Sequence, residues 1–112
     1  MAITRYLKEV SDYQLLSAED EKKLFEKVRD GDRDAREAAI TANLRLVINV
    51  ARRYLYTRVP FSDLVQEGNF GLIKAVDKYD PSLGKRFSTY AIFWIKQSVL
   101  KYLNDNKNIL KH

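Results

Sequence analysis

The stretch KRFSTYAIFWIKQSVLK, residues 85–101, decides the fold of this chain. Read as a helix that starts near Ser88, it turns by about 100° per residue and presents two different apolar faces. The first face is aliphatic, as the core stripe of a small helical domain would be, and contains Ala91, Ile92, Ile95, Val99 and Leu103. Because this face can supply the core, the opposite face is free for another use.

The second face is aromatic and ends in polar residues. We call it the aromatic face, and it consists of Tyr90, Phe93, Trp94, Gln97 and Lys101. Lys85, Arg86 and Lys96 add positive charge around it. Large rings more often belong to cores, but the core stripe is already present here. Rings offer flat surfaces on which bases stack, and cations neutralise phosphates, so the pattern indicates a nucleic-acid surface.

Composition narrows the class of protein. The 112 residues suit one domain with a single helical core. Cysteine is absent and the one histidine is His112, so we expect no metal and no cofactor. No apolar run approaches the roughly 20 residues of a membrane span, so we expect no membrane partner and a cytoplasmic location. The net charge of +5 is uneven: residues 41–112 hold 12 basic and 5 acidic side chains, net +7.

Apolar residues recur at helical spacing throughout, and no alternating strand pattern occurs. The predicted class is therefore all-α, with about five helices joined by short turns. Besides the helix that contains the aromatic face, the expected helices cover residues 3–10, 18–29, a long segment from Asp32 to about Tyr56, and 63–78.

Local signals mark the ends of these helices. Ser17, Asp32 and Ser62 are predicted N-caps, Gly31 is a predicted helix stop, and residues 80–84 have the composition of a turn. The expected buried stripes are Leu24 and Val28, with Phe25 beside them, in one helix, and Ile40, Leu44, Val47, Ile48, Ala51 and Leu55 in the long helix.

The helix over residues 63–78 presents a second candidate surface. One side, expected to turn toward the core, contains Val65, Asn69, Leu72 and Val76. The other side mixes charges with apolar side chains, as an interface does, and contains Asp63, Gln66, Glu67, Phe70, Ile73, Lys74 and Asp77. A plain solvated face is the alternative. Gly68 and Gly71 each cost about 1 kcal/mol inside a helix, so we expect a neighbouring helix to approach closely there.

Three stretches closely resemble the sigma-70 class of bacterial sigma factors. DLVQEGNFGLIKAVDKYDPSLGKRFSTYAIFWIKQ, residues 63–97, resembles the polymerase-binding and promoter-melting core of that class. ANLRLVINVARRY, residues 42–54, resembles the helix before it, and YLKEVSDYQLLSAEDE, residues 6–21, the conserved N-terminal helical segment. The resemblance implies one domain over 1–112, with an N-terminal segment over 1–31 and the helical core over 32–112.

The resemblance implies recognition and melting of the −10 promoter element through capture of the non-template strand. Tyr90 would stack on the base flipped at the start of the bubble, and Gln97 would face the last paired position, where an amide can pair with adenine. Asn43 and Leu46, with Asn49 nearby, match a pocket for a second flipped base. The residues expected to bind DNA are Leu7, Lys8, Asn43, Leu46, Asn49, Arg52, Arg53, Lys78, Lys85, Arg86, Phe87, Thr89, Tyr90, Phe93, Trp94, Lys96, Gln97 and Lys101.

The resemblance also implies binding of the RNA polymerase core. The partner would be the coiled coil of the beta-prime subunit, and an anti-sigma factor is a further candidate partner. The residues expected to bind the polymerase are Asp63, Gln66, Glu67, Asn69, Phe70 and Ile73.

The chain departs from the common family pattern at three positions. Phe93 replaces a tryptophan, Leu100 a threonine and Ile92 a small polar residue, which leaves the upstream base-pair preference open. The long insertion that many primary members carry before residue 42 is absent, so we expect a compact or alternative member. The promoter-recognition helix-turn-helix is also absent, and we expect a fragment or an excised core domain.

Two other functions fit the residues. A helical protein–protein adaptor would bury both candidate surfaces against proteins and bind no specific DNA. A general single-strand or RNA binder would show affinity without sequence preference. An enzyme fits least, because Asp63, Glu67, Asp77 and Asp80 come with no nucleophile–base pair and no glycine-rich phosphate loop.

Overall fold

The computed structural model describes residues 16–106. Over this range the chain contains five α-helices, two short 3₁₀ helices and no strand, which confirms the predicted all-α class. The helix expected over residues 3–10 lies outside the described residues. The elements are α2 (Ala18–Arg29), α3 (Arg33–Ala42), α4 (Leu44–Ala51), η1 (Arg52–Thr57), α5 (Phe61–Lys78), η2 (Pro81–Leu83) and α6 (Phe87–Asp105).

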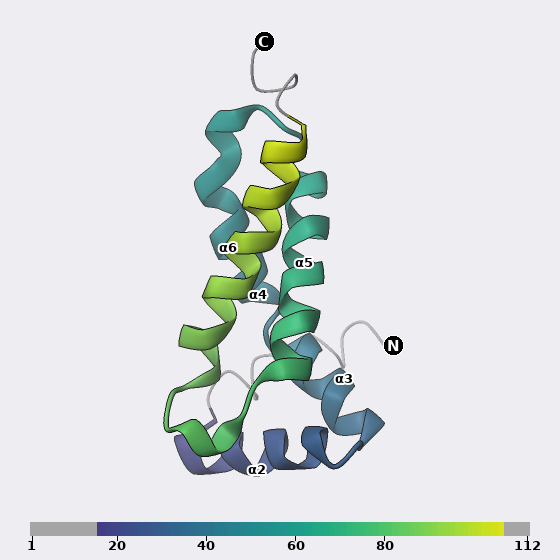
Figure 1. Ribbon diagram of the computed structural model, residues 1–112, viewed down its shortest axis with the longest axis vertical. Coiled ribbons are helices and arrows are strands. Elements are labelled where there is room, and N and C mark those ends of the chain that lie inside the picture. Colours follow the sequence, from purple (N-terminus) through teal and green to yellow (C-terminus); the bar gives the residue numbers. More distant parts are fainter. Residues whose placement is uncertain (1–15, 107–112) are drawn as a thin grey trace.

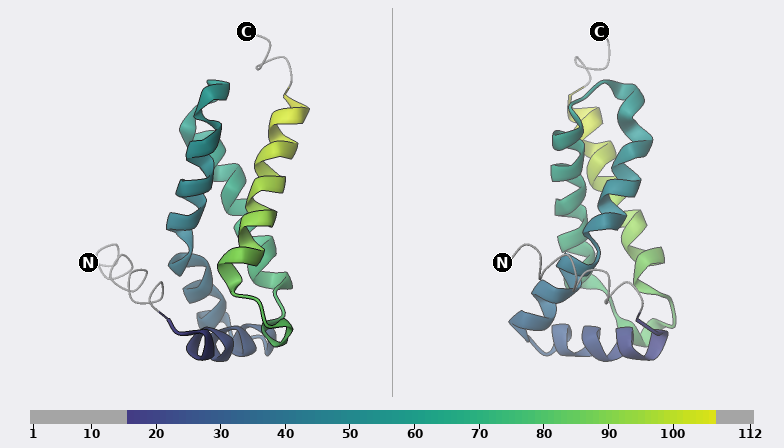
Figure 2. Two further views of the ribbon diagram at one scale, coloured as in Figure 1. Left: turned by 90° about the vertical axis from the view of Figure 1, so that its left-hand side faces the viewer. Right: turned by 180° about the vertical axis from the view of Figure 1, so that it is seen from behind.

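Helices α4, α5 and α6 run along the long axis and form a bundle (Figure 1). α5 and α6 lie side by side, and α4 with η1 packs against both, as the turned views also show (Figure 2). α2 crosses one end of the bundle, where it meets α3 and the turn before α6. The first turn of α6 therefore lies at the α2 end, while η1 lies at the opposite end.

The structure confirms the helix signals around α2 and α3. The Asp20 amide donates to Ser17 Oγ at 3.1 Å, and the Ala35 amide donates to Asp32 Oδ1 at 3.0 Å. After α2, Gly31 adopts a φ of 91°, a conformation that glycine reaches without steric penalty. The amide of Asp32 then reaches back to the carbonyl of Lys27 at 3.0 Å, which is the Schellman ending of a helix.

The prediction of one long helix from Asp32 to Tyr56 was wrong, because the helix breaks at Asn43. The side-chain Nδ2 of Asn43 donates to the carbonyl of Ala39 at 2.8 Å and takes the place of a helical amide. Asn43 leaves the helical region, with φ −111° and ψ 12°, so α3 ends and α4 begins. After Ala51 the chain winds on as the 3₁₀ helix η1.

The predicted N-cap at Ser62 was also wrong. α5 begins at Phe61, one residue before Ser62, and Pro60 occupies the cap position with φ −51° and ψ 134°. The carbonyl of Pro60 accepts the amides of Asp63 at 3.0 Å and Leu64 at 3.2 Å, so helical bonding starts at the proline. Ser62 therefore lies in the first turn and does not cap the helix.

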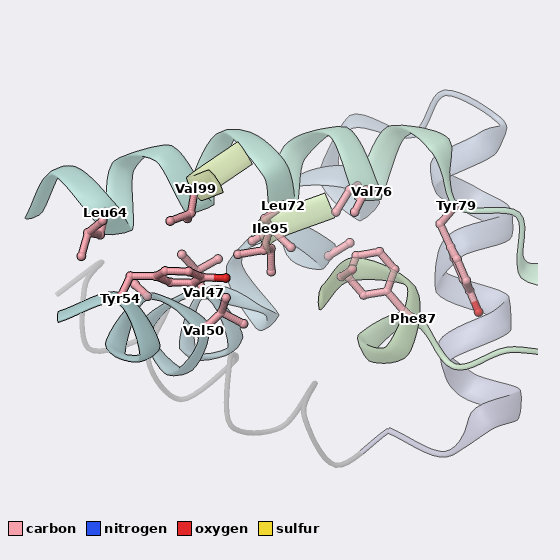
Figure 3. Close-up of a cluster of buried hydrophobic side chains, with 14 of the residues drawn as sticks. Val47, Val50, Tyr54, Leu64, Leu72, Val76, Tyr79, Phe87, Ile95 and Val99 are labelled. Atoms are coloured by element: carbon pink, nitrogen blue, oxygen red, sulfur yellow. The ribbon is translucent and has the colours of Figure 1, made fainter. Parts of the chain in front are cut away.

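The core lies between α4, α5 and α6 and continues toward α2 (Figure 3). Ala91, Ile95, Val99 and Leu103 are buried as predicted, whereas Ile92 is only half-buried. In α2 the deeply buried residue is Phe25, while Leu24 and Val28 lie at the core edge. Each fully buried aromatic or aliphatic side chain contributes about 1.5–3 kcal/mol.

The predicted stripe of the long helix needs correction at Leu44 and at Leu55. Val47 and Ala51 are buried as expected, but Leu44 and Leu55 are exposed. The break at Asn43 and the tighter winding of η1 change the phase of the side chains. Val50 and Tyr54 turn inward in their place, with Tyr54 facing Leu64 at the start of α5; the buried set from α4 and η1 is Val47, Val50, Ala51, Tyr54 and Thr57.

The two glycines of α5 lie where other helices approach closely, as predicted. A Cβ at Gly68 would stand 2.8 Å from Cγ1 of Val47. A Cβ at Gly71 would meet the carbonyl oxygen of Trp94 and stand 2.8 Å from Cα of Ile95. The absence of a side chain at Gly71 thus lets the backbones of α5 and α6 come together beside Trp94, a residue of the aromatic face.

Candidate nucleic-acid and partner interfaces

A continuous series of aromatic rings leads from the core to the surface of α6. Phe25 and Phe87 stack at 4.5 Å between centroids, and Tyr79 meets Phe87 edge-on at 5.2 Å. Tyr79 contacts Tyr90 at 5.5 Å, and Tyr90 contacts Trp94 at 6.2 Å. These distances suit aromatic pairs, so the inner rings hold the outer rings in place.

The rings of the aromatic face differ in exposure. Tyr90 and Trp94 are half-buried and pack against the core, whereas Phe93 is 56% exposed. Phe93 meets Trp94 edge-on at 5.8 Å, and Lys78 Nζ lies 5.8 Å from the Trp94 ring centroid, within cation–π range. Gln97 and Lys101 are exposed. The face therefore offers one exposed ring beside two partly covered rings.

Phe87 was predicted to bind DNA, and its position contradicts that prediction. Its side chain is only 1% exposed and lies between Phe25 and Tyr79. It precedes Ala91 by four residues and so continues the core stripe of α6. Phe87 supports the aromatic face from below and is not part of it.

The basic residues around the aromatic face occupy different environments. Lys85 and Thr89 are exposed at the start of α6, and Lys96 is half-buried. Arg52 and Arg53 belong to η1, at the end of the bundle away from the first turn of α6. The structure therefore does not bring the two arginines next to the first turn of α6, where the aromatic face begins. Leu7 and Lys8 lie outside the described residues.

Arg86 and Glu21 join α2 to the beginning of α6. Arg86 Nε donates to Glu21 Oε2 at 3.1 Å, and Arg86 Nη2 donates to the carbonyl of Leu16 at 3.0 Å. The same Glu21 oxygen accepts the backbone amide of Phe87 at 3.1 Å. A carboxylate at a helix N-terminus is favoured by the helix dipole, so Glu21 serves as the cap that α6 lacks locally.

A pocket of about 220 Å³ lies between α2, the α3–α4 break and the first turn of α6. The three residues predicted to hold a second base, Asn43, Leu46 and Asn49, all line it. Arg86 lines it too, and the structure adds Glu21, Arg45 and Ser88, which the sequence did not single out. The remaining lining residues are Leu16, Leu24, Phe25 and Ala42. The pocket combines apolar walls with amides and charges of both signs.

The predicted interface on α5 is largely on the surface. Phe70 is 51% exposed, Gln66 is exposed, and Asp63, Glu67 and Ile73 are half-buried. This mixture of an exposed ring with carboxylates and an amide suits a basic partner with an apolar pocket. We call these five residues the α5 face.

Two further residues of α5, Asn69 and Asp77, are not free surface groups. Oδ1 of Asn69 is buried and has no hydrogen-bond partner in the described part of the chain, so Asn69 does not present its oxygen on the exposed surface. Asp77 accepts from Arg36 Nε at 2.7 Å and from Arg36 Nη2 at 3.1 Å. The hydrogen bonds from Arg36 hold the pKa of the Asp77 carboxyl below its usual value. Asp77 thus ties α5 to α3.

The α5 face and the aromatic face adjoin each other along the groove between α5 and α6. A hollow of about 440 Å³ is lined by Glu67, Phe70, Ile73 and Tyr102, and a second, of about 450 Å³, by Trp94 and Gln97. Both hollows share four lining residues, Lys74, Ser98, Lys101 and Asp105. Burial, together with the carboxylates of Asp63 and Glu67, raises the pKa of the Tyr102 hydroxyl. The two surfaces are thus neighbours.

The described residues contain no group of three His, Cys, Asp or Glu side chains arranged to hold a metal ion. None of the helices between residues 16 and 106 is long and apolar enough to cross a membrane.

Two family models match the sequence of this chain. The family model described as Sigma-70 region 2 matches residues 39–109, and the model described as Sigma-70 factor, region 1.2 matches residues 2–34. The chain belongs to the sigma-70 family.

Three similar proteins cover most of the chain. RNA polymerase sigma factor SigA from a Bacillus species is 44% identical over 109 residues, and SigA from Clostridium acetobutylicum is 45% identical over 109 residues. Each alignment covers 97% of this chain and 29% of the relative. RNA polymerase sigma factor RpoS from Coxiella burnetii is 50% identical over 94 residues, or 84% of this chain and 27% of the relative. The chain therefore spans less than a third of these relatives.

Proposed function

We propose that this chain acts in transcription initiation by binding the RNA polymerase core and by recognising and melting the −10 promoter element. In this proposal the aromatic face and the neighbouring pocket capture flipped bases of the non-template strand. The α5 face binds the beta-prime coiled coil of the polymerase. Membership of the sigma-70 family supports the general role, and the arrangement of the two surfaces supports the division of tasks.

The observation that carries the proposal is the pocket beside the first turn of α6. Its volume of about 220 Å³ is large enough for one nucleobase, and Asn43 and Asn49 line it together with Arg86. Flipping a base costs a few kcal/mol, which stacking and a shaped pocket must offset. Amides can hydrogen-bond a base edge. The guanidinium of Arg45, which also lines the pocket and is exposed, can neutralise a phosphate. Stacking on Phe93, Tyr90 or Trp94 would contribute about 1–3 kcal/mol per base.

One observation favours the adaptor alternative. Tyr90 and Trp94 are half-buried, so the aromatic face offers less free ring surface than its sequence indicates. An adaptor would use Phe93 and Phe70 as apolar anchors, since both are more than half exposed, and would need no contact with DNA.

A titration with single-stranded DNA separates these functions. The full chain is titrated into a labelled TATAAT-type strand and into its scrambled form, in one buffer at one salt concentration. Tighter binding of the TATAAT-type strand supports the proposal. Equal binding of both strands indicates a general single-strand binder. An adaptor binds neither strand above the nonspecific background.

A further inference from the structure

The end of the bundle opposite α2 carries a surface that the proposed function does not use. It is formed by η1 and the turn into α5 (Figure 1). A 3₁₀ helix has three residues per turn, so side chains three positions apart line up along one edge. Tyr54 and Thr57 form the buried edge of η1. The other two edges of the helix face solvent.

Arginines alternate with apolar side chains on the two exposed edges. Arg52 and Leu55 follow one edge at an interval of three, and Arg53 and Tyr56 follow the other. Arg58 comes directly after the end of η1 and is exposed. Leu55 is 51% exposed and Tyr56 is 77% exposed. Phe61, the first residue of α5, is exposed at the same end of the bundle. We call this surface the basic tip, and it consists of Arg52, Arg53, Leu55, Tyr56, Arg58 and Phe61.

The charge of the basic tip is not neutralised by the described residues. Arg36 and Arg86 each pair with a carboxylate, whereas Arg52, Arg53 and Arg58 form no ion pair within residues 16–106. Within residues 16–106, therefore, three guanidinium groups without an ion pair accompany the exposed apolar side chains of the same surface and make it positive. Such a surface is complementary to a negative partner that has an apolar residue to bury.

The backbone of Arg58 supports a role in binding. Arg58 ends η1 with φ 64° and ψ 7°, in the left-handed region. This region disfavours residues with a Cβ, and glycine fits it best. The other described residues with φ in this range are glycines, Gly31 and Gly84. An arginine here lowers the stability of the turn and gains no ion pair in the described fold, so its side chain is available to an external partner.

We propose that the basic tip is a docking surface for an acidic protein segment that carries an apolar anchor residue. Arginine and tyrosine are enriched at protein interfaces, where buried rings and guanidinium groups supply most of the binding energy. Leu55 favours a protein over a nucleic acid, because an aliphatic side chain has no aromatic face on which a base can stack. This proposal goes beyond the −10 element and the beta-prime contact and does not depend on either.

The test is a titration of the isotopically labelled full chain, in which binding is monitored through the NMR signals of the backbone amides. The probe is a short synthetic peptide of glutamate and leucine. Two control peptides replace leucine by serine or glutamate by lysine, and a short DNA duplex is the competing ligand. We expect the glutamate–leucine peptide to shift the signals of residues 52–61 and to bind more tightly than either control peptide. No binding of this peptide at millimolar concentration, shifts confined to other residues, or a tighter response of residues 52–61 to DNA would overturn the proposal.

Two variants test the same surface. Tyr56→Ser should weaken binding of the glutamate–leucine peptide, and Arg58→Gly should weaken it about two- to fivefold, as for the loss of an exposed ion pair. Arg58→Gly should also raise the thermal unfolding temperature, because glycine suits the left-handed conformation. The control is Lys22→Ser, which removes an exposed cation from α2 and should leave peptide binding unchanged. If Arg58→Gly binds the peptide as tightly as the unmodified chain, the docking surface is refuted.

Discussion

Glu21 accepts a hydrogen bond from the backbone amide of Phe87 at 3.1 Å, although the two residues are 66 positions apart. The carboxylate thereby caps α6, because Arg86 at the N-cap position makes no side-chain cap. Replacing Glu21 with alanine should lower the free energy of unfolding by about 0.5–2 kcal/mol, the usual effect of losing a cap. Chemical denaturation followed by circular dichroism measures this change. Glu19→Ala is the matched control, since Glu19 is exposed on the same helix, and its effect should stay within about 0.5 kcal/mol.

A second prediction concerns Gly71 and Gly68. Gly71→Ala should destabilise the fold by about 1–3 kcal/mol, because the new methyl group meets the backbone of α6 at Trp94 and Ile95. Gly68→Ala should cost less, because the new methyl group would meet side-chain methyl groups of Val47 and Ile95 and not the backbone of another helix. Urea unfolding of both variants measures which of them loses more free energy of unfolding. A Gly71→Ala variant as stable as the unmodified chain would contradict the close approach of α5 and α6.

A third prediction concerns pH and the pair of Arg36 and Asp77. Hydrogen bonds from Arg36 lower the pKa of Asp77 in the folded state, so protons bind this carboxyl more readily after unfolding. Its contribution to stability is therefore present above the ordinary value of 3.8 and is lost as pH falls below it. Both side chains are nearly half exposed, so Asp77→Asn should cost only about 0.2–1 kcal/mol at pH 7. Denaturation at pH 7 and at pH 3 should show the difference shrinking in acid, and a constant difference would exclude this mechanism.

The exposure of Phe93 makes it the cleanest test of the aromatic face. Phe93→Ala should weaken binding to the −10 single strand by about 1–3 kcal/mol if a base stacks there. Its thermal unfolding temperature should change little, since the ring is more than half exposed. Tyr90→Ala and Trp94→Ala should lower both strand affinity and stability, because their rings pack against the core. Unchanged strand affinity in Phe93→Ala would remove this ring from the proposed DNA surface.

The adjoining surfaces lead to a prediction about Lys101. Glu67→Lys should weaken polymerase binding strongly, by placing a like charge opposite a basic partner, and leave strand binding equal or slightly tighter. Phe93→Ala should have the opposite pattern. Lys101 lines both hollows of the α5–α6 groove. Lys101→Ala should weaken strand binding, because it removes a cation that attracts phosphate, and should leave polymerase binding equal or slightly tighter, because a cation there repels a basic partner. The measurement is each variant against polymerase core and against the −10 strand at one salt concentration. Loss of strand binding by a folded Glu67→Lys would show that the two surfaces are not separable.

Features that depend on residues three or four apart were predictable from the sequence. Ser17 and Asp32 cap their helices by accepting hydrogen bonds from backbone amides three residues further along. The residues that signal each cap and the residues that form its hydrogen bond therefore lie in the same short stretch of sequence. The burial of Phe87 was equally accessible, because it continues the four-residue spacing of Ala91 and Ile95. Its position on the helix, and not its aromatic character, determines that it is buried.

Other features depend on competition or on distance. At Asn43 a side-chain amide competes with the helical backbone for the carbonyl of Ala39. The spacing of apolar residues does not depend on this hydrogen bond, so it could not predict the break. Glu21 becomes part of the candidate pocket only when α2 crosses the end of α6. Nothing within a few residues of Glu21 or Phe87 indicates that they meet, so the contact could be found only from the three-dimensional structure.

The break at Asn43 means that the pocket exists because a helix is imperfect. Ala42, Asn43, Arg45 and Leu46 line it from both sides of the interruption, so a continuous helix through this point would redirect these side chains. A substitution that restores regular helical bonding at Asn43 would favour the helix and disfavour the pocket. At this one position, therefore, a more regular helix and the present shape of the pocket exclude each other.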